Sequence, residues 1–190
     1  MTALTLGRLR IQPGFLLILA LILVYDSGSG LPVLLGLAGL CHELGHLLAA
    51  RLLGLEVRQL RLGFFGAELD LPGLAACPWW GEALLLAAGS GVNLALAALC
   101  CALSGETAHL FGAVNLLLAY FNLAPIPPLD GGRLLEVLAA RLLPGVWGLT
   151  VSDLIAGLAR GILLGLGAAL AWKGNFSLLL LALWLILGQA

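Results

Sequence analysis

The sequence predicts an all-α polytopic membrane protein with about six transmembrane helices and a short membrane-associated β-hairpin after the second. Composition is the first reason: of 190 residues, 62% are hydrophobic and only 10% are charged, whereas about a quarter of a soluble domain is charged. The mean hydropathy is +1.11. The second reason is the recurrence of apolar segments near the roughly 20 residues that a helix needs to cross a bilayer. The length predicts one transmembrane domain over residues 1–190, embedded in the lipid bilayer.

The predicted spans are the six apolar segments at about 11–25, 31–53, 82–103, 109–123, 154–172 and 176–187. Pro13 suits the first turn of the first span. Arg160 is expected near the start of the fifth span, with its charge reaching the interface. The tight loop KGN joins the fifth and sixth segments, so one re-entrant hairpin is an alternative to two crossings.

Residues Glu56–Gly73, between the second and third spans, mix apolar and charged side chains in near alternation, with turn residues in GFFG. This pattern predicts a short β-hairpin. An ordinary amphipathic loop is the alternative.

The arginines predict the orientation of the spans. They flank the N-terminal side of the first span and follow the second and fourth: Arg8, Arg10, Arg51, Arg58, Arg61, Arg133 and Arg141. Only Lys173 falls on the other side. The positive-inside rule therefore places both termini in the cytoplasm.

Composition also narrows the partners. The net charge of −1 says nothing about partners. No basic run occurs, so nucleic acid is not an expected partner. The cysteines contain no C-x-x-C pair and are predicted to be small buried hydrophobic residues rather than a disulfide framework.

The segment HELGH places His42, Glu43 and His46 inside the second predicted span. Ionisable residues are costly in a bilayer and usually functional there. Positions i and i+4 share a helix face, so both imidazoles can reach one metal ion, with Glu43 beside them to take a proton from water. Zinc suits two such nitrogens, a third ligand and an open position for water. The alternative is a set of buried, hydrogen-bonded polar residues.

The third ligand must come from another segment, and Asp130 is the best candidate. It lies in FNLAPIPPLDGGRLLE, where prolines end the fourth span. Irregular backbone at membrane depth is tolerated where it lines a polar cavity. With the orientation above, Asp130 and the histidines all fall in the cytoplasmic half. The alternative is that Asp130 caps a helix over residues 131–143.

HELGH followed by NLAPIPPLDGG resembles the site-2 protease family of intramembrane zinc metalloproteases, whose motifs are H-E-x-x-H and N-x-x-P-x-x-P-L-D-G. The likeness covers residues 36–143, and the catalytic core is expected at about 31–143. AAGSGVNLALA resembles the third span of the family, with Gly89 and Asn93 at its small and Asn positions and Ser90 where a proline is usual. The size, without a PDZ domain, resembles the stage IV sporulation protein FB branch, here without the CBS domain that its members often carry. A prokaryotic plasma membrane is the expected location.

The resemblance implies an intramembrane metalloendopeptidase that cleaves within or next to a transmembrane segment of a membrane-bound regulatory protein. Zn²⁺ is held by His42, His46 and Asp130, and Glu43 is the catalytic base. Asn122 supports the transition state or holds the substrate, with a helix-breaking polar cap as its alternative role. An edge strand at Val57–Phe65 is expected to bind the extended substrate. Asn93 is expected to bridge helices, and His109 to lie at the membrane interface. A regulatory membrane partner is also expected, in an oligomeric state that the sequence leaves open.

A metal-ion or small-solute membrane transporter is the alternative function, since the same residues can bind a passing ion. Transporters commonly contain paired broken helices from internal repeats, and only one broken segment is evident here. A noncatalytic membrane scaffold is the third class, and the intact Glu43 argues against it.

Overall fold

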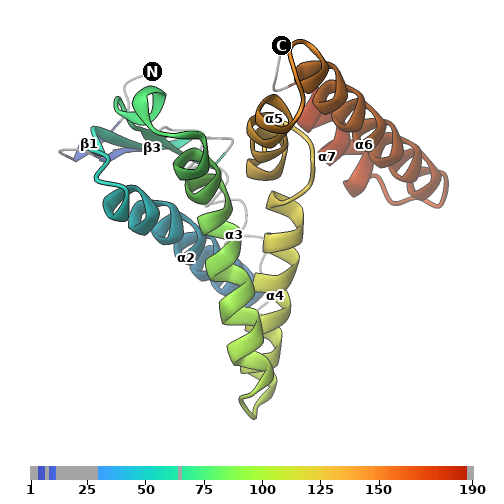
Figure 1. The fold of residues 1–190 in the computed structure, drawn as a ribbon. Helices are drawn as coiled ribbons and strands as arrows, with labels where there is room; N and C mark the ends of the chain where they lie inside the picture. Colours follow the sequence, from blue (N-terminus) through green and yellow to red (C-terminus); the bar gives the residue numbers. More distant parts are fainter. Residues whose placement is uncertain (1–3, 7–8, 12–29, 64–65, 188–190) are drawn as a thin grey trace. The chain divides into compact units, whose positions relative to one another are not determined.

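The computed structural model describes residues 4–6, 9–11, 30–63 and 66–187 (Figure 1). The chain divides into two compact units. The first contains Met1–Gly81 and Ala88–Ala119, and the second contains Glu82–Ala87 and Tyr120–Ala190.

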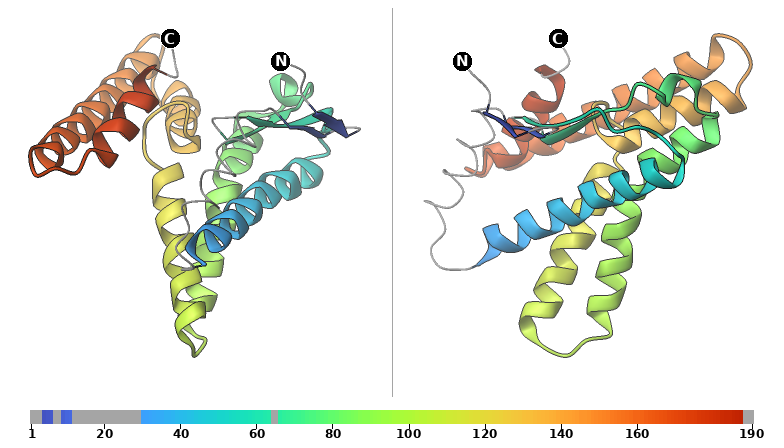
Figure 2. Two further views of the ribbon diagram at one scale, coloured as in Figure 1. Left: turned by 180° about the vertical axis from the view of Figure 1, so that it is seen from behind. Right: turned by 90° about the vertical axis from the view of Figure 1, so that its left-hand side faces the viewer.

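Three helices build most of the first unit: α2 (Leu31–Leu52), α3 (Trp79–Cys101) and α4 (Glu106–Asn122). A proline lies in the first turn of α2, where its missing N–H costs nothing. The chain turns from α3 into α4 through Gly105, whose φ of 126° suits only glycine. Both views of Figure 2 show α3 and α4 running side by side as an antiparallel hairpin. These helices confirm the second, third and fourth predicted helical segments.

Helices α2 and α3 touch at their backbones. A Cβ atom added to Gly45 would lie 2.7 Å from the carbonyl oxygen of Ala88 and 3.0 Å from the Cα of Gly89. Small residues permit this approach, as in other membrane helix pairs. Gly36, Gly39 and Gly91 make no such contact with the described residues, since a Cβ at each of these positions has none of their heavy atoms outside its own helix within 4 Å.

The outer face of α2 is a stripe of leucines. Leu40, Leu44, Leu48 and Leu52 are each more than half exposed, at intervals of four residues. His42 and His46 lie on the buried face. A helix that turns its leucines outward and its imidazoles inward suits a lipid environment on one side and a polar site on the other.

A four-stranded sheet belongs to the first unit, with order β1 (Leu4–Leu6), β2 (Leu9–Ile11), β3 (Gln59–Gly63), β4 (Gly66–Asp70). Strands β3 and β4 pair antiparallel and confirm the predicted hairpin. Strand β3 also pairs in parallel with β2.

This sheet corrects two expectations. Strand β3 is interior, so the predicted edge strand at Val57–Phe65 is wrong, and β4 is an edge of the sheet formed by the described strands. Ile11, predicted to open the first span, instead ends β2. The rest of that span, from residue 12 to 25, lies outside the described residues.

The second unit contains α5 (Asp130–Leu142), α6 (Trp147–Trp172) and α7 (Ser177–Leu187). Helix α6 packs against both α5 and α7. A Cβ on Gly167 would meet the backbone of Leu179 at 2.8 Å, so α6 and α7 are in close contact. Arg160 lies near the middle of α6 rather than near its start, because the helix begins earlier than predicted.

The described helices differ in whether they are long enough to cross a membrane. Helices α2, α3 and α6 are long and apolar enough to cross a membrane. The 17 residues of α4 correspond to about 25 Å of helix, and the 11 residues of α7 to about 16 Å, against a hydrocarbon core of about 30 Å. The described helices thus supply three candidate spans, fewer than the predicted number of crossings.

Candidate metal centre

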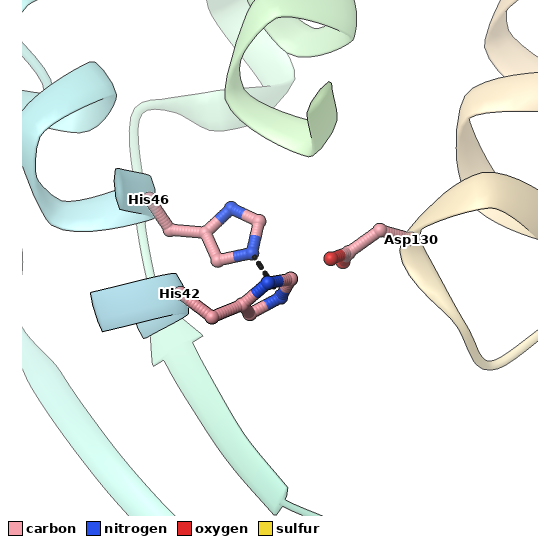
Figure 3. Close-up of side chains that lie close together, drawn as sticks. All are labelled: His42, His46 and Asp130. Atoms are coloured by element: carbon pink, nitrogen blue, oxygen red, sulfur yellow. Dashed lines mark hydrogen bonds between the residues drawn. The ribbon is translucent and has the colours of Figure 1, made fainter. Parts of the chain in front are cut away.

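The side chains of His42 and His46 converge in the first unit. Their Nε2 atoms lie 3.1 Å apart, and the two rings meet edge to face with centroids separated by 4.7 Å. Figure 3 shows the hydrogen bond between them. Both residues are buried, with 5% and 8% of their surface exposed. The spacing of four residues on a helix therefore brings both imidazoles to one point, as the sequence predicts.

The geometry of the pair suits a shared metal ion. Two nitrogens bound to one zinc at about 2.0–2.1 Å in a tetrahedral site lie about 3.3 Å apart, close to the 3.1 Å observed. The pair thus fits two ligands of one zinc ion.

Gly89 provides the space in front of the imidazoles. A Cβ atom at this position would lie 2.7 Å from both Cε1 and Nε2 of His42, and it would also collide with Nε2 of His46. The missing side chain of Gly89 therefore leaves the Nε2 atoms uncovered. The motif spacing of α2 gives no signal for this, because the contact joins two helices.

Asn93 on α3 holds the other side of His42. Its Oδ1 accepts a hydrogen bond of 2.8 Å from His42 Nδ1. Its Nδ2 donates to the carbonyl oxygen of Ala38 on α2 and to Asn115 Oδ1 on α4. Asn93 bridges three helices, as expected, and it also contacts a predicted ligand, which the sequence analysis missed. Metal-binding histidines usually donate their second N–H in this way.

Glu43 follows His42 directly on α2 and is partly buried. His109, the third histidine, lies away from this pair in the sequence and makes a separate hydrogen bond. Its Nε2 donates a 2.9 Å hydrogen bond to the carbonyl oxygen of Leu103, which steadies the turn between α3 and α4. His109 is exposed and lies in the first turn of α4.

Asp130 belongs to the second unit, where it is the first residue of α5 and partly buried. The N-cap of α5 is Leu129, so the alternative of an Asp130 cap is wrong. Figure 3 shows the side chain of Asp130 extending from α5. Asn122, the last residue of α4, also falls in the second unit and is partly buried.

The segment before Asp130 is fixed by backbone packing. A Cβ on Gly131 would collide with the carbonyl group of Leu123, and one on Gly132 would collide with the backbone of Ile126 and Pro127. Ile126 and Leu129 are buried in a core with Leu185 of α7. Leu129 and Gly131, the neighbours of Asp130, are thus held by close packing. This packing restricts the direction of the Asp130 side chain.

The fold is similar to a solved structure, the site-2 protease from Methanocaldococcus jannaschii. The TM-score is 0.70, and the match covers 98% of this chain and 92% of that chain at 22% sequence identity. This likeness concerns the fold.

Sequence comparisons identify the family. The model of peptidase family M50 matches residues 104–164. A Mycobacterium tuberculosis protein named zinc metalloprotease Rip3 is 40% identical over 121 residues, which cover 57% of this chain and 30% of that protein. The chain belongs to peptidase family M50, the site-2 protease family.

Two further relatives agree with this assignment. A Synechocystis protein named zinc metalloprotease sll0528 is 34% identical over 152 residues, covering 66% of this chain and 40% of that protein. Stage IV sporulation protein FB of Bacillus subtilis is 32% identical over 143 residues, covering 72% of this chain and 49% of that protein. The chain spans less than half the length of each of these relatives.

Proposed function

We propose that this M50 chain is an intramembrane zinc metalloprotease. It hydrolyses a peptide bond within or next to a transmembrane segment of a membrane-bound regulatory protein. The observation that carries the proposal is the convergence of two buried Nε2 atoms, 3.1 Å apart, on a helix long and apolar enough to span a membrane. Charged or polar groups are retained at such depth when function requires them.

The proposed ligands of zinc are His42, His46 and Asp130. They offer two imidazole nitrogens and one carboxylate oxygen, a donor set that leaves a fourth tetrahedral position open. Zinc supplies Lewis-acid activation of water when it is bound. The remaining chemistry belongs to side chains of the protein.

Glu43 is the proposed catalytic base. It accepts the proton of the attacking water and delivers it to the leaving amine. Asn122 donates a hydrogen bond to the developing oxyanion or holds the substrate strand. Its place at the end of α4, where the helix stops before a proline-rich segment, supports this role.

Strand β4 is the proposed docking edge for substrate. A peptide bond in a helix is shielded by its own hydrogen bonds, so cleavage requires a locally extended chain. Strand β4 pairs with β3 on one side, and an extended peptide can add to its other side by main-chain hydrogen bonds.

The proposed orientation places both termini and the zinc site toward the cytoplasmic side of a prokaryotic plasma membrane. The exposed Arg51 at the end of α2 and Arg141 at the end of α5 support it, since positive charge gathers on the cytoplasmic side. We also propose that the chain acts as one catalytic domain whose cleavage is controlled by a regulatory membrane partner.

The function is tested with the wild type and Glu43→Gln, reconstituted in liposomes. Substrates are first trapped by Glu43→Gln in host membranes and identified by mass spectrometry. Cleavage of the trapped protein by the wild type alone, with zinc bound to both proteins, supports the proposal. Ion flux through the wild type without cleavage would instead establish a transporter.

A further inference from the structure

A chain of buried amides leads from α4 to the first histidine. Asn115 Nδ2 donates a 2.9 Å hydrogen bond to the carbonyl oxygen of Phe111, one turn earlier on α4. Asn115 Oδ1 accepts a 2.8 Å hydrogen bond from Asn93 Nδ2. Asn93 Oδ1 lies 2.8 Å from His42 Nδ1. Both asparagines are completely buried.

The hydrogen bonds of this chain have a fixed direction. A backbone carbonyl can only accept, so the bond to Phe111 identifies the amide nitrogen of Asn115 and leaves its oxygen facing Asn93. The nitrogen of Asn93 then donates to Asn115 Oδ1 and to the carbonyl oxygen of Ala38. Its oxygen therefore faces His42 Nδ1, which must carry the proton.

The protonation of Nδ1 decides what the other nitrogen offers. A neutral imidazole with its proton on Nδ1 has a lone pair on Nε2, the form that binds a metal. That Nε2 atom faces His46 in the space left by Gly89. Two carbonyl oxygens, on α2 and α4, thus determine the tautomer of a side chain on α2.

We propose that Asn115 and Asn93 are positioning residues that hold His42 as its Nδ1–H tautomer and aim its Nε2 lone pair at the metal position. The consequence for metal affinity rests on the proposed zinc function. The tautomer itself is a property of the metal-free protein.

If the asparagines only joined the helices, their amide groups would not need one particular orientation. A bridge would be preserved by any arrangement that satisfies the amides, including one with the amide nitrogen of Asn93 toward His42. The two carbonyl anchors exclude that arrangement, because it would place amide oxygens against backbone oxygens.

The test uses the full chain, metal-free, in liposomes at mildly alkaline pH, with ¹⁵N-labelled histidine and solid-state NMR. The sequence has 3 histidines, so His46→Gln and His109→Gln assign the spectrum. In the wild type, His42 should show a protonated Nδ1 and a bare Nε2. A proton on His42 Nε2 in the wild type would overturn the proposal without reference to any variant.

Variants then separate positioning from packing. Asn93→Leu and Asn115→Leu should each give a mixture of His42 tautomers and weaken zinc binding about 10- to 100-fold, measured by competition with a zinc-binding dye. Ser90→Ala is the matched control, because Ser90 is completely buried on the same helix and its Oγ has no hydrogen-bond partner among the described residues. It should change neither readout.

The outcomes distinguish this inference from the proposed function. An unchanged tautomer in folded Asn93→Leu and Asn115→Leu would refute the positioning role, even if the wild type cleaves its substrate. The predicted tautomers, together with a wild type that binds no zinc, would support the positioning role and refute the metalloprotease. If the leucine variants do not fold, the wild-type spectrum still decides the question.

Discussion

The two regions that carry the proposed ligands hold their side chains by different means. In the first unit, His42 is held by side-chain hydrogen bonds that cross from α2 to α3 and α4. In the second unit, the residues around Asp130 are held by backbone packing at Gly131 and Gly132. The difference shows two ways to hold a polar group in place. A regular helix has no free backbone groups and needs amide side chains, whereas a broken helix can use its own main chain.

The largest effect on zinc binding is expected at Gly89 in the first unit, because the imidazoles occupy the space that a Cβ atom would fill. Gly89→Ala places a methyl group against the Nε2 atoms of His42 and His46. Zinc binding should fall by more than the roughly 100-fold that loss of an outer-shell partner costs, as measured by dye competition. Gly91→Ala, two residues later on α3, places its methyl group more than 4 Å from every described heavy atom outside its own helix and should bind zinc like the wild type. Equal zinc affinity in both variants would refute the role of Gly89.

In the second unit, a substitution at the packed backbone before α5 is expected to lower the stability of the protein. Gly132→Ala forces a methyl group into the backbone of Ile126 and Pro127, and it should lower the free energy of unfolding by about 1–3 kcal/mol. Thermal unfolding followed by tryptophan fluorescence measures this, since Trp184 packs on the same core. Gly165→Ala on α6 is the control, since its methyl group contacts none of the residues that the structure describes outside its own helix. A Gly132→Ala protein as stable as the wild type would show that the segment before α5 is not clamped.

A smaller effect is expected at the sheet. Consecutive amides of a strand point to opposite sides, so one of Ala67→Pro and Glu68→Pro removes an amide from the outer edge of β4 and leaves the pairing with β3 intact. That variant should lower kcat/KM about tenfold, the loss of one or two main-chain hydrogen bonds to substrate, with zinc content unchanged. Wild-type turnover by both proline variants would exclude β4 as the docking edge.

The sequence predicted the features that depend on local spacing. The separation of His42 and His46, the break before Asp130 and the hairpin of β3 and β4 each follow from a few neighbouring residues. Features that depend on contacts between distant segments were missed. Gly89 and Asn93 lie more than 40 residues from the histidines that they contact, and β2 pairs with a strand far along the chain. Ile11 falls in a predicted span because its apolar neighbours satisfy a strand and a helix equally well.

Zinc-edge X-ray absorption on the purified, zinc-loaded chain tests the central claim most directly. The account predicts one zinc per chain with only nitrogen and oxygen ligands, at about 2.0–2.1 Å. Zinc content should be lost in His42→Ala and reduced in Asp130→Ala. Sulfur at about 2.3 Å, which Cys41 beside His42 would supply, or zinc that persists after both histidines are replaced, would contradict it.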